Sequence, residues 1–407
     1  MGGKPFTWAG KGFFVAKALQ AKNVLAQFFI CRAQEQREAM LRAGLLYRRD
    51  MVDKRIVDIL VPLSGKGGVE NVINMVSDKL IKSGYRVRVV QMVYTGPEWV
   101  GSGIEFYPVL VNKKVDNVED FVGMYAEFMA VHGRQDVVIA TPWPFMAYVA
   151  RAALKSLGLE SVKVAAWLHA PVKVYKDNGT GGMECLSFAD CTMVLTRKAV
   201  KQIKEVLPEH RVELVGNPVD MTGIEPLSSW NLDNRTLLYV GRISREKRLD
   251  VIIDAMTKTQ SMWKLRVIGD GDELASCKER AEYSGVSDFI SWQGWKNNPW
   301  ENYNDVTALV LASDYEGFSL VAAEALARGI PVISPPVDGI SEYIVPGVNG
   351  FFYGQGDSSE LAMVLDALAG RILPDVVPEN CVKSVAMYEK EKVLTEILDI
   401  IESLIDN

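Results

Sequence analysis

The chain has 407 residues, of which 48% are hydrophobic and 24% are charged, and its formal net charge at pH 7 is −6. This composition is typical of an ordinary soluble globular protein that is long enough for two domains. An acidic chain is a poor nucleic-acid binder, so a nucleic-acid partner is not expected. No uncharged apolar run approaches the ~18 residues of a membrane-spanning helix, so no transmembrane segment is expected either.

The five cysteines and three histidines are scattered along the chain. They form no C-x-x-C pair and show no spacing typical of metal ligands, so they predict no metal site. The cysteine usage and the absence of a recognisable signal peptide indicate a reducing, cytoplasmic compartment.

Residues 1–50 are basic, with nine Lys and Arg against three Asp and Glu. Residues 12–49 contain few helix breakers, and Phe14, Leu25 and Phe28 fall roughly on one side, so a helical extension is expected. A basic amphipathic helix suits peripheral contact with the anionic inner face of the cytoplasmic membrane. An appendage packed on the body, or an extension with no role, is the simpler interpretation.

A strand–helix–strand unit follows the extension. Residues 56–63 are expected to form a strand, residues 69–82 a helix and residues 86–94 a second strand. Gly67 and Gly68 lie at the strand–helix junction, where bare backbone can approach an anionic group. The glycine run lacks the ending of a P-loop and the spacing of a dinucleotide fingerprint, so a purely structural tight turn explains it equally well.

Four further strands are expected in the first half: residues 136–141, 162–168, 191–195 and 212–215. His169 directly follows the second of these. Because α/β proteins bind ligands at the carboxyl ends of parallel strands, His169 is a candidate ligand contact. A surface histidine, or one satisfied by hydrogen bonds, is the alternative.

A second alternation of strands and helices begins after residues 218–234, a linker with Pro, Ser and Asn. Residues 237–240 are expected to be a strand, and the loop after it carries Gly241, Arg242 and Lys247 ahead of a helix. An arginine fork and a lysine point charge in one strand-to-helix loop suit a diphosphate. A solvated basic loop is the alternative.

The strand expected at residues 264–268 ends in Gly-Asp-Gly-Asp at 269–272. The Asp-x-Asp pair suggests a metal site, but two glycines followed by a helix favour a strand–turn–helix junction. After a further strand at residues 289–293, Gly294 and Trp295 form a turn against which a planar base could lie.

Two glutamates flank a helix start in the second half. The apolar run 308–312 predicts a buried strand, and Ser319 is a suitable N-cap for a helix over residues 320–328. Glu316 then lies in the loop and Glu324 in the helix. About eight residues of helix span ~12 Å, whereas a retaining glycosidase needs its carboxyl groups ~5 Å apart, so that activity is disfavoured. A solvated glutamate pair is the remaining alternative.

The remaining elements complete two α/β halves. A buried strand at residues 331–334 and helices at about 359–369 and 384–405 follow. Strands that alternate with helices predict two domains with parallel sheets. The expected boundaries are an extension at 1–50, a first domain at 51–220, a second domain at 221–382 and a final helical segment at 383–407.

Five segments together carry a likeness to a known family: Gly67-Gly68-Val69-Glu70, Tyr239-Val-Gly-Arg242 with Glu246-Lys247, Ile268-Gly-Asp-Gly271, Glu316 through Ile333, and Asp338-Gly-Ile-Ser-Glu342 with Asn349-Gly-Phe351. They resemble the retaining glycosyltransferases of the GT-B fold, the glycosyl transferases group 1 family. The resemblance covers about residues 56–380 and is most specific in the second half. Gly294-Trp295 followed by Asn298-Pro-Trp-Glu301 is similar to the bacterial lipopolysaccharide-core galactosyltransferase branch.

The resemblance implies two Rossmann-like domains with parallel sheets facing a central cleft, the first on the acceptor side and the second holding the nucleotide-sugar donor. The final helical segment would cross back to the first domain. The catalytic residues that it implies are Arg242 and Lys247 on the donor diphosphate, Glu316 on the sugar and phosphates, and His169 on the transferred sugar. The donor-binding residues that it implies are Gly67, Gly68, Gly241, Gly269, Gly294, Trp295, Gly317, Phe318, Ser319, Leu320 and Glu324, the last of these on the ribose hydroxyls. Ser319 and Arg248 stand where many members have glycine.

The implied reaction moves a hexose, galactose or glucose, from a UDP-sugar to a glycan or glycolipid acceptor in bacterial surface polysaccharide synthesis. No metal ion or other cofactor is expected, because Arg, Lys and helix N–H groups can stabilise the charge on the departing nucleotide diphosphate. A UDP-sugar 2-epimerase with the same two domains is one alternative. A non-catalytic partner of another transferase is a second alternative, against which the intact set of Arg242, Lys247, Glu316 and Glu324 argues.

Overall fold

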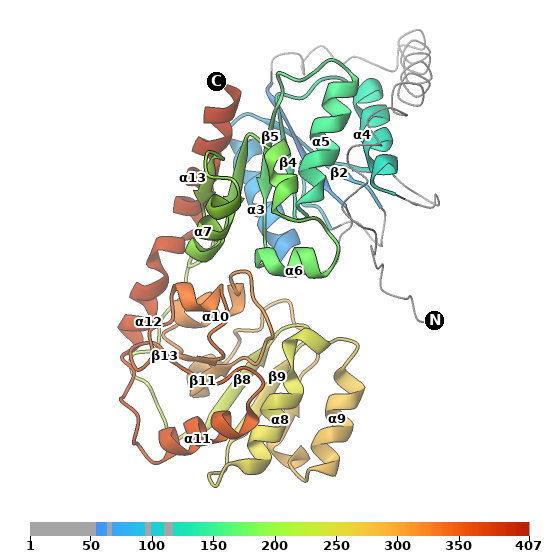
Figure 1. Ribbon diagram of the computed structural model, residues 1–407. Helices are drawn as coiled ribbons and strands as arrows, with labels where there is room; N and C mark the ends of the chain where they lie inside the picture. The colour runs from blue at the N-terminus through green and yellow to red at the C-terminus, as the bar shows by residue number, and fades with distance from the viewer. Residues whose placement is uncertain (1–53, 63–66, 94–98, 110–116, 407) are drawn as a thin grey trace. The chain divides into compact units, whose positions relative to one another are not determined.

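The protein divides into two compact units. The computed structural model describes residues 54–62, 67–93, 99–109 and 117–406 (Figure 1). The first unit comprises the chain up to Val215 together with the residues from Leu394 onward, and the second comprises Gly216–Val393. The expected basic extension at residues 1–50 lies outside the described residues. In the described part of the chain, no helix is both long enough and apolar enough to span a membrane.

The first unit is built on a seven-stranded parallel sheet in the order β3-β2-β1-β4-β5-β6-β7. Its strands are β1 (Ile56–Val61), β2 (Arg86–Gln91), β3 (Glu105–Pro108), β4 (Val137–Ala140), β5 (Lys163–Trp167), β6 (Cys191–Val194) and β7 (Val212–Leu214). Strands β1, β4 and β5 are buried along nearly their whole length, as expected for a parallel sheet covered by helices on both faces. Strand order reverses between β1 and β4.

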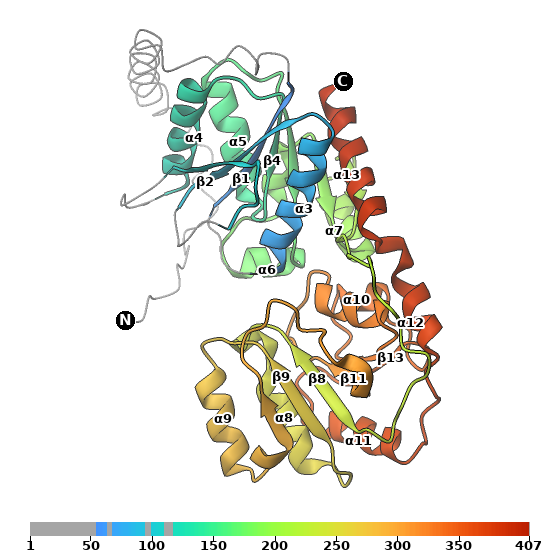
Figure 2. The ribbon, with the colours of Figure 1, turned by 180° about the vertical axis from the view of Figure 1, so that it is seen from behind.

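Helices cover both faces of this sheet (Figures 1 and 2). They are α3 (Gly68–Lys82), α4 (Val118–His132), α5 (Phe145–Ser156), α7 (Arg197–Val206) and, from Leu394, the helix α13 (Lys390–Ile405), while the short helix α6 (Val172–Asp177) lies beyond the carboxyl end of β5 (Figure 1). The apolar sides of α4 and α5 form one core with alternate residues of the central strands. Helix α13 buries Ile397, Ile401 and Leu404. Just after this helix, Asp406 Oδ1 forms an ion pair at 2.8 Å with Nη2 of Arg55, the residue before β1.

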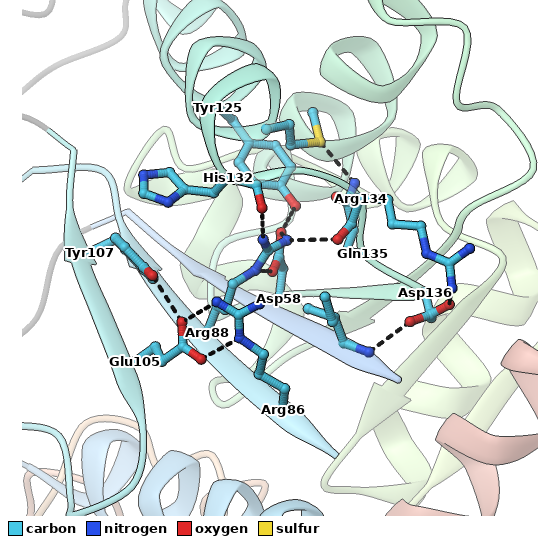
Figure 3. A network of polar contacts seen from close by, with 12 residues as sticks. Asp58, Arg86, Arg88, Glu105, Tyr107, Tyr125, His132, Arg134, Gln135 and Asp136 are labelled. Atoms are coloured by element: carbon cyan, nitrogen blue, oxygen red, sulfur yellow. Dashed lines mark hydrogen bonds and ion pairs between the residues drawn. The ribbon is translucent and has the colours of Figure 1, made fainter. Parts of the chain in front are cut away.

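An ion pair without any exposed side-chain surface joins the strands β1 and β2 (Figure 3). Asp58 and Arg88 are register neighbours, and the guanidinium donates to both carboxylate oxygens at 2.6 and 3.0 Å. The Tyr125 hydroxyl donates to the same carboxylate at 2.7 Å, and Arg88 also donates to the His132 carbonyl at 3.0 Å. Burial raises the pKa of Asp58, against the lowering effect of Arg88. The pair is tolerated in the core because each charge is met by several partners.

The second unit is built on a six-stranded parallel sheet in the order β10-β9-β8-β11-β12-β13. Its strands are β8 (Thr236–Val240), β9 (Lys264–Ile268), β10 (Ile290–Trp292), β11 (Ala308–Val310), β12 (Val332–Ser334) and β13 (Gly350–Phe352). Its helices are α8 (Leu249–Lys258), α9 (Leu274–Tyr283), α10 (Leu320–Ala327), α11 (Ser358–Ala369) and α12 (Pro378–Val385). Strand order reverses between β8 and β11, and α/β proteins bind ligands at the carboxyl ends of strands beside such a reversal.

The expected single helix over residues 384–405 is wrong, because the chain there forms two helices, α12 and α13, with a break between them. Residues Ala386–Tyr388 form a 3₁₀ turn, and Glu389 is extended. The Val219 N–H donates to the Tyr388 carbonyl at 2.8 Å, and the Lys390 N–H donates to the Val219 carbonyl at 3.0 Å. This pairing with a distant residue takes the hydrogen bonds that would continue the helix.

Two short strands were not expected from the sequence, and both lie at the edge of a sheet. Strand β3 has four residues and ends in Pro108, which cannot donate to a ladder and so suits an edge. Strand β13 has three residues and begins at Gly350, in a segment whose glycines predict a loop. Pairing with β2 and β12, and not local preference, makes these segments strands.

Candidate active site

Lys247 and Glu316 meet at the strand-order reversal of the second sheet. Lys247 ends the 3₁₀ turn that follows β8, and Glu316 lies in the loop after β11. The Lys247 Nζ is 2.8 Å from Glu316 Oε1, and the Ser313 hydroxyl donates to the same oxygen at 2.8 Å. Glu316 is buried and Lys247 is partly exposed. The structure thus brings together two predicted site residues that lie far apart in the sequence, and it fixes the ammonium group in one position.

The loop that carries Arg242 and Lys247 is anchored at both ends. The buried Tyr239 hydroxyl donates to the Arg242 carbonyl at 2.7 Å, while the Arg242 side chain is exposed. Arg248 has a left-handed backbone with φ 50°, a conformation that favours glycine. Its guanidinium pairs with Asp250 at 3.0 Å and with Asp314 at 3.4 Å. The backbone at this position therefore favours glycine, the residue that the family resemblance implies there, and the two ion pairs explain how arginine is accommodated.

Backbone hydrogen bonds link the three loops that carry the predicted donor-binding residues Gly241, Gly269 and Gly294 at the carboxyl edge of the second sheet. The Gly241 N–H donates to the Ile268 carbonyl at 3.0 Å, and the Gly269 N–H donates to the Gly294 carbonyl at 2.8 Å. A Cβ on Gly269 would lie 1.9 Å from the Gly241 carbonyl oxygen, so no other residue fits there. These glycines let three successive loops cross closely and leave a surface of bare backbone.

The Gly-Asp-Gly-Asp sequence forms the strand–turn–helix junction that was favoured over a metal site. Asp270 Oδ1 accepts the Gly271 N–H at 2.8 Å, and a Cβ on Gly271 would lie 2.2 Å from the Ile243 carbonyl oxygen. Within the described ranges, no group of three or more His, Cys, Asp or Glu side chains is arranged to hold a metal ion.

The Phe318 side chain belongs to the core and not to an open surface. It is 1% exposed, and its ring packs at 5.3 Å from the Tyr343 ring and 4.8 Å from the Tyr388 ring, centroid to centroid. The Tyr343 hydroxyl lies 2.7 Å from the Phe318 carbonyl and 3.0 Å from the Ser319 carbonyl. At this position a ligand would meet backbone only. Gly317 before it and Leu320 after it are partly exposed.

Ser319 precedes α10, but the expected side-chain cap is wrong. Its side chain makes no capping hydrogen bond, and its Oγ is buried without a partner among the described residues. The backbone is left-handed with φ 66°, whereas an N-cap residue that bonds to the first turn normally has an extended backbone. This conformation favours glycine, which is the residue that the family resemblance implies at this position.

Replacing Ser319 with glycine should therefore stabilise the protein. The left-handed conformation costs a non-glycine residue ~1–2 kcal/mol. The more flexible unfolded chain of the glycine variant offsets ~0.5–1 kcal/mol of the gain. We expect Ser319→Gly to raise the midpoint of thermal unfolding, and Ser341→Gly, at an exposed position with negative φ, to lower it. An equal decrease of the unfolding midpoint in both variants would contradict the proposed backbone strain at residue 319.

Glu324 lies in the second turn of α10 and is partly buried. Its Oε2 accepts the indole N–H of Trp300 at 2.9 Å. Burial raises the pKa of Glu324, and Trp300 and Arg328 oppose this effect. Trp300 was not predicted as a site residue, although the Asn-Pro-Trp-Glu sequence that contains it was noted. Trp295, the predicted base contact, is 57% exposed.

His169, Gly67 and Gly68 lie in the first unit, whereas the other predicted site residues lie in the second. His169 follows β5, and its backbone N–H donates to the Tyr175 hydroxyl at 2.8 Å. Both ring nitrogens are buried and have no hydrogen-bond partner in the described part of the chain. Burial lowers the pKa of His169 to about 3, so the ring is neutral at physiological pH. Gly67 is extended and Gly68 begins α3.

Comparison with known proteins identifies the family of this chain. The family model of the glycosyl transferases group 1 matches residues 224–370. A lipopolysaccharide 1,6-galactosyltransferase of Escherichia coli strain K12 is 31% identical over 246 residues, which are 58% of this chain and 67% of that protein.

Solved structures establish the fold. The lipopolysaccharide outer core galactosyltransferase WaaB in its apo form has a TM-score of 0.70 and 22% identity, over 86% of this chain and 99% of that chain. Anabaena HepE in complex with UDP and glucose has a TM-score of 0.64 and 15% identity, over 86% of this chain and 100% of that chain. The two parallel sheets are therefore those of the GT-B fold. The chain belongs to the glycosyl transferases group 1 family and is a glycosyltransferase.

Proposed function

We propose that the protein transfers a hexose, galactose or glucose, from a UDP-sugar to a glycan or glycolipid acceptor, with retention of anomeric configuration and without a metal ion. The setting would be bacterial surface polysaccharide synthesis. The likeness to a lipopolysaccharide galactosyltransferase supports the sugar and the acceptor class, and the likeness to a structure that holds UDP and glucose supports the donor. Membership in the family favours transfer over the epimerase and the non-catalytic alternatives.

The observation that carries this proposal is the Lys247–Glu316 pair beside the start of α10. The ammonium is held by a buried carboxylate at 2.8 Å, and the first N–H groups of α10 lie in the segment that follows Glu316. A fixed cation and the amino end of a helix together suit a diphosphate. Arg242 lies in the same loop as Lys247 and would add a second cation.

In the proposed reaction the bond between the sugar C1 and the phosphate oxygen breaks, and its electron pair stays on that oxygen. The acceptor hydroxyl oxygen bonds to C1 from the same face, and its proton passes to the phosphate oxygen. Preorganised cations and backbone N–H groups stabilise the charge that develops on the leaving diphosphate. His169, with a neutral ring and two ring nitrogens that have no partner among the described residues, would contribute a hydrogen bond to the transferred sugar.

A panel of nucleotide sugars tests the proposed donor. UDP-galactose, UDP-glucose, UDP-N-acetylglucosamine and GDP-mannose are each added to the protein, and thermal unfolding and slow hydrolysis are measured. We expect a UDP-hexose to raise the unfolding midpoint most, since a ligand at 100-fold its Kd stabilises by ~2.7 kcal/mol. Hydrolysis should persist in EDTA.

Other outcomes of the panel would contradict specific parts of the proposal. Loss of hydrolysis in EDTA would show that a metal ion is needed. Epimerisation of UDP-N-acetylglucosamine without any acceptor would support the epimerase instead. A preference for GDP-mannose would exclude a UDP-sugar as the donor.

A further inference from the structure

Trp300, Glu324 and Arg328 contact one another near the carboxyl end of α10. The Trp300 indole N–H donates to Glu324 Oε2 at 2.9 Å. The Arg328 guanidinium lies 4.5 Å above the centre of the Trp300 ring, and it also donates to the Glu324 main-chain carbonyl at 2.8 Å. Trp300 is 6% exposed and Arg328 is partly buried. The ring is therefore fixed by a cation on its face while its N–H fixes the carboxylate.

In this arrangement the two oxygens of the Glu324 carboxylate have different surroundings. Trp300 engages Oε2 only, so Oε1 is not held by the indole. An indole N–H is a donor with no acceptor capacity, and so it cannot compete for a ligand's hydroxyl proton. A carboxylate that is held at one oxygen presents the other in a defined direction, which suits a hydroxyl donor and lowers the ordering cost of binding.

We propose that Trp300 is a positioning residue that aims Glu324 at the ribose hydroxyls of the donor nucleotide, and that it thereby sets the preference for a ribonucleotide over a deoxyribonucleotide. The inference rests on the proposed function, because it takes a nucleoside diphosphate sugar as the ligand. Trp300 contacts the carboxylate and acts on the nucleotide through it.

The ionisation of Glu324 gives a second readout. The charged and titratable groups that face Glu324 are Arg328 on its own helix and Asp220 from the segment before β8, together with the hydrogen bond from Trp300. A hydroxyl donates to the ionised carboxylate, so binding is strong above the Glu324 pKa and weakens as the pH falls through it. Burial raises this pKa and the Trp300 N–H lowers it. Removal of the Trp300 N–H should therefore raise the pKa of Glu324, so that nucleotide binding weakens at a higher pH than in the wild type.

The test measures binding of UDP and of 2′-deoxy-UDP to the full-length protein by calorimetry between pH 5 and 8. The variants are Trp300→Phe, Glu324→Gln and the double variant. Trp230→Phe is the matched control, because it removes an indole donor in the same unit, to the Thr307 carbonyl at 2.7 Å, without touching Glu324. Comparing each variant with the wild type at the same pH cancels the titration of the nucleotide's own phosphate.

We expect Trp300→Phe to weaken UDP binding about tenfold or more, as a lost hydrogen bond to a charged group does, and to weaken 2′-deoxy-UDP binding less. The deficit should grow as the pH falls and should vanish in the Glu324→Gln background, since the two residues act as a unit. Trp230→Phe should bind both nucleotides like the wild type.

Three outcomes would overturn the inference. Unchanged UDP binding in Trp300→Phe means that the indole only packs. An equal loss for both nucleotides that persists with Glu324→Gln means a general structural effect. A wild-type protein that binds neither nucleotide overturns the proposed UDP-sugar donor as well. Tight UDP binding that is unchanged in Trp300→Phe overturns only the role of Trp300 and leaves the proposed function standing.

Discussion

Arg242→Ala should lower hexosyl transfer by ~10²-fold or more while leaving the unfolding temperature unchanged. The guanidinium would stabilise charge on the leaving diphosphate as it develops, so its loss should appear in kcat. The Arg242 side chain is exposed, so truncation should leave the core intact. The measurement is steady-state transfer from the UDP-hexose selected by the nucleotide-sugar panel.

Arg245→Ala is the matched control for Arg242→Ala. Arg245 is an exposed arginine in the same loop, three residues further along the chain, and no role in the site is assigned to it. It should keep near-wild-type turnover, which would show that the effect at residue 242 is not a general loss of positive charge. Near-wild-type turnover of Arg242→Ala would contradict the assigned role, and equal losses in both variants would indicate non-specific steering of an anionic substrate.

Arg88→Met should destabilise the first unit by ~3–5 kcal/mol, because it leaves the Asp58 carboxylate buried without its counter-charge. Both side chains are 0% exposed. Among the described residues that now bond to the Asp58 carboxylate through their side chains, only Tyr125 would remain. Chemical denaturation of the variant against the wild type measures the loss.

The matched control is Arg86→Met on the same strand (Figure 3). Arg86 pairs with Glu105 through two contacts, but the side chains are 22% and 27% exposed, so water can partly replace the lost partner and the loss should be smaller than that of Arg88→Met. Similar losses in Arg86→Met and Arg88→Met would show that burial of the Asp58 pair does not decide its contribution.

The loss in Arg88→Met should also depend on pH in a defined direction. Burial already raises the pKa of Asp58, and removal of Arg88 takes away the strongest opposing charge. The folded variant then binds a proton at a pH where the unfolded chain does not, so stability falls as the pH rises. Denaturation at pH 5 should therefore show a smaller deficit than denaturation at pH 8.

The sequence predicts the parallel sheets well because their central strands are continuous apolar runs. The expected bounds of β9, residues 264–268, agree with the structure, and most other strands differ by a residue or two at their ends. Lys247 was predicted as a diphosphate contact from the loop in which it lies, and Glu316 was predicted as a contact of the sugar and phosphates from the family resemblance. Their ion pair was not predicted, because it depends on β8 and β11 being neighbours in the sheet.

Features that depend on tertiary contacts or on backbone conformation could not be predicted in this way. Asp58 sits inside an expected apolar strand, and only the register with β2 shows that Arg88 faces it. Ser319 has a side chain that suits an N-cap, but the left-handed backbone at that position removes the capping bond. The break before α13 follows from pairing with Val219, which is remote in the sequence.

The division of the chain has a consequence for how the protein is made. The first unit takes the part of α13 from Leu394 onward as one of its helices, and that helix buries Ile397 and Ile401. During synthesis, the second unit is therefore complete in sequence before the first one is. Until α13 leaves the ribosome, the apolar surface that it will cover stays exposed, and a nascent chain at that stage is expected to bind chaperones.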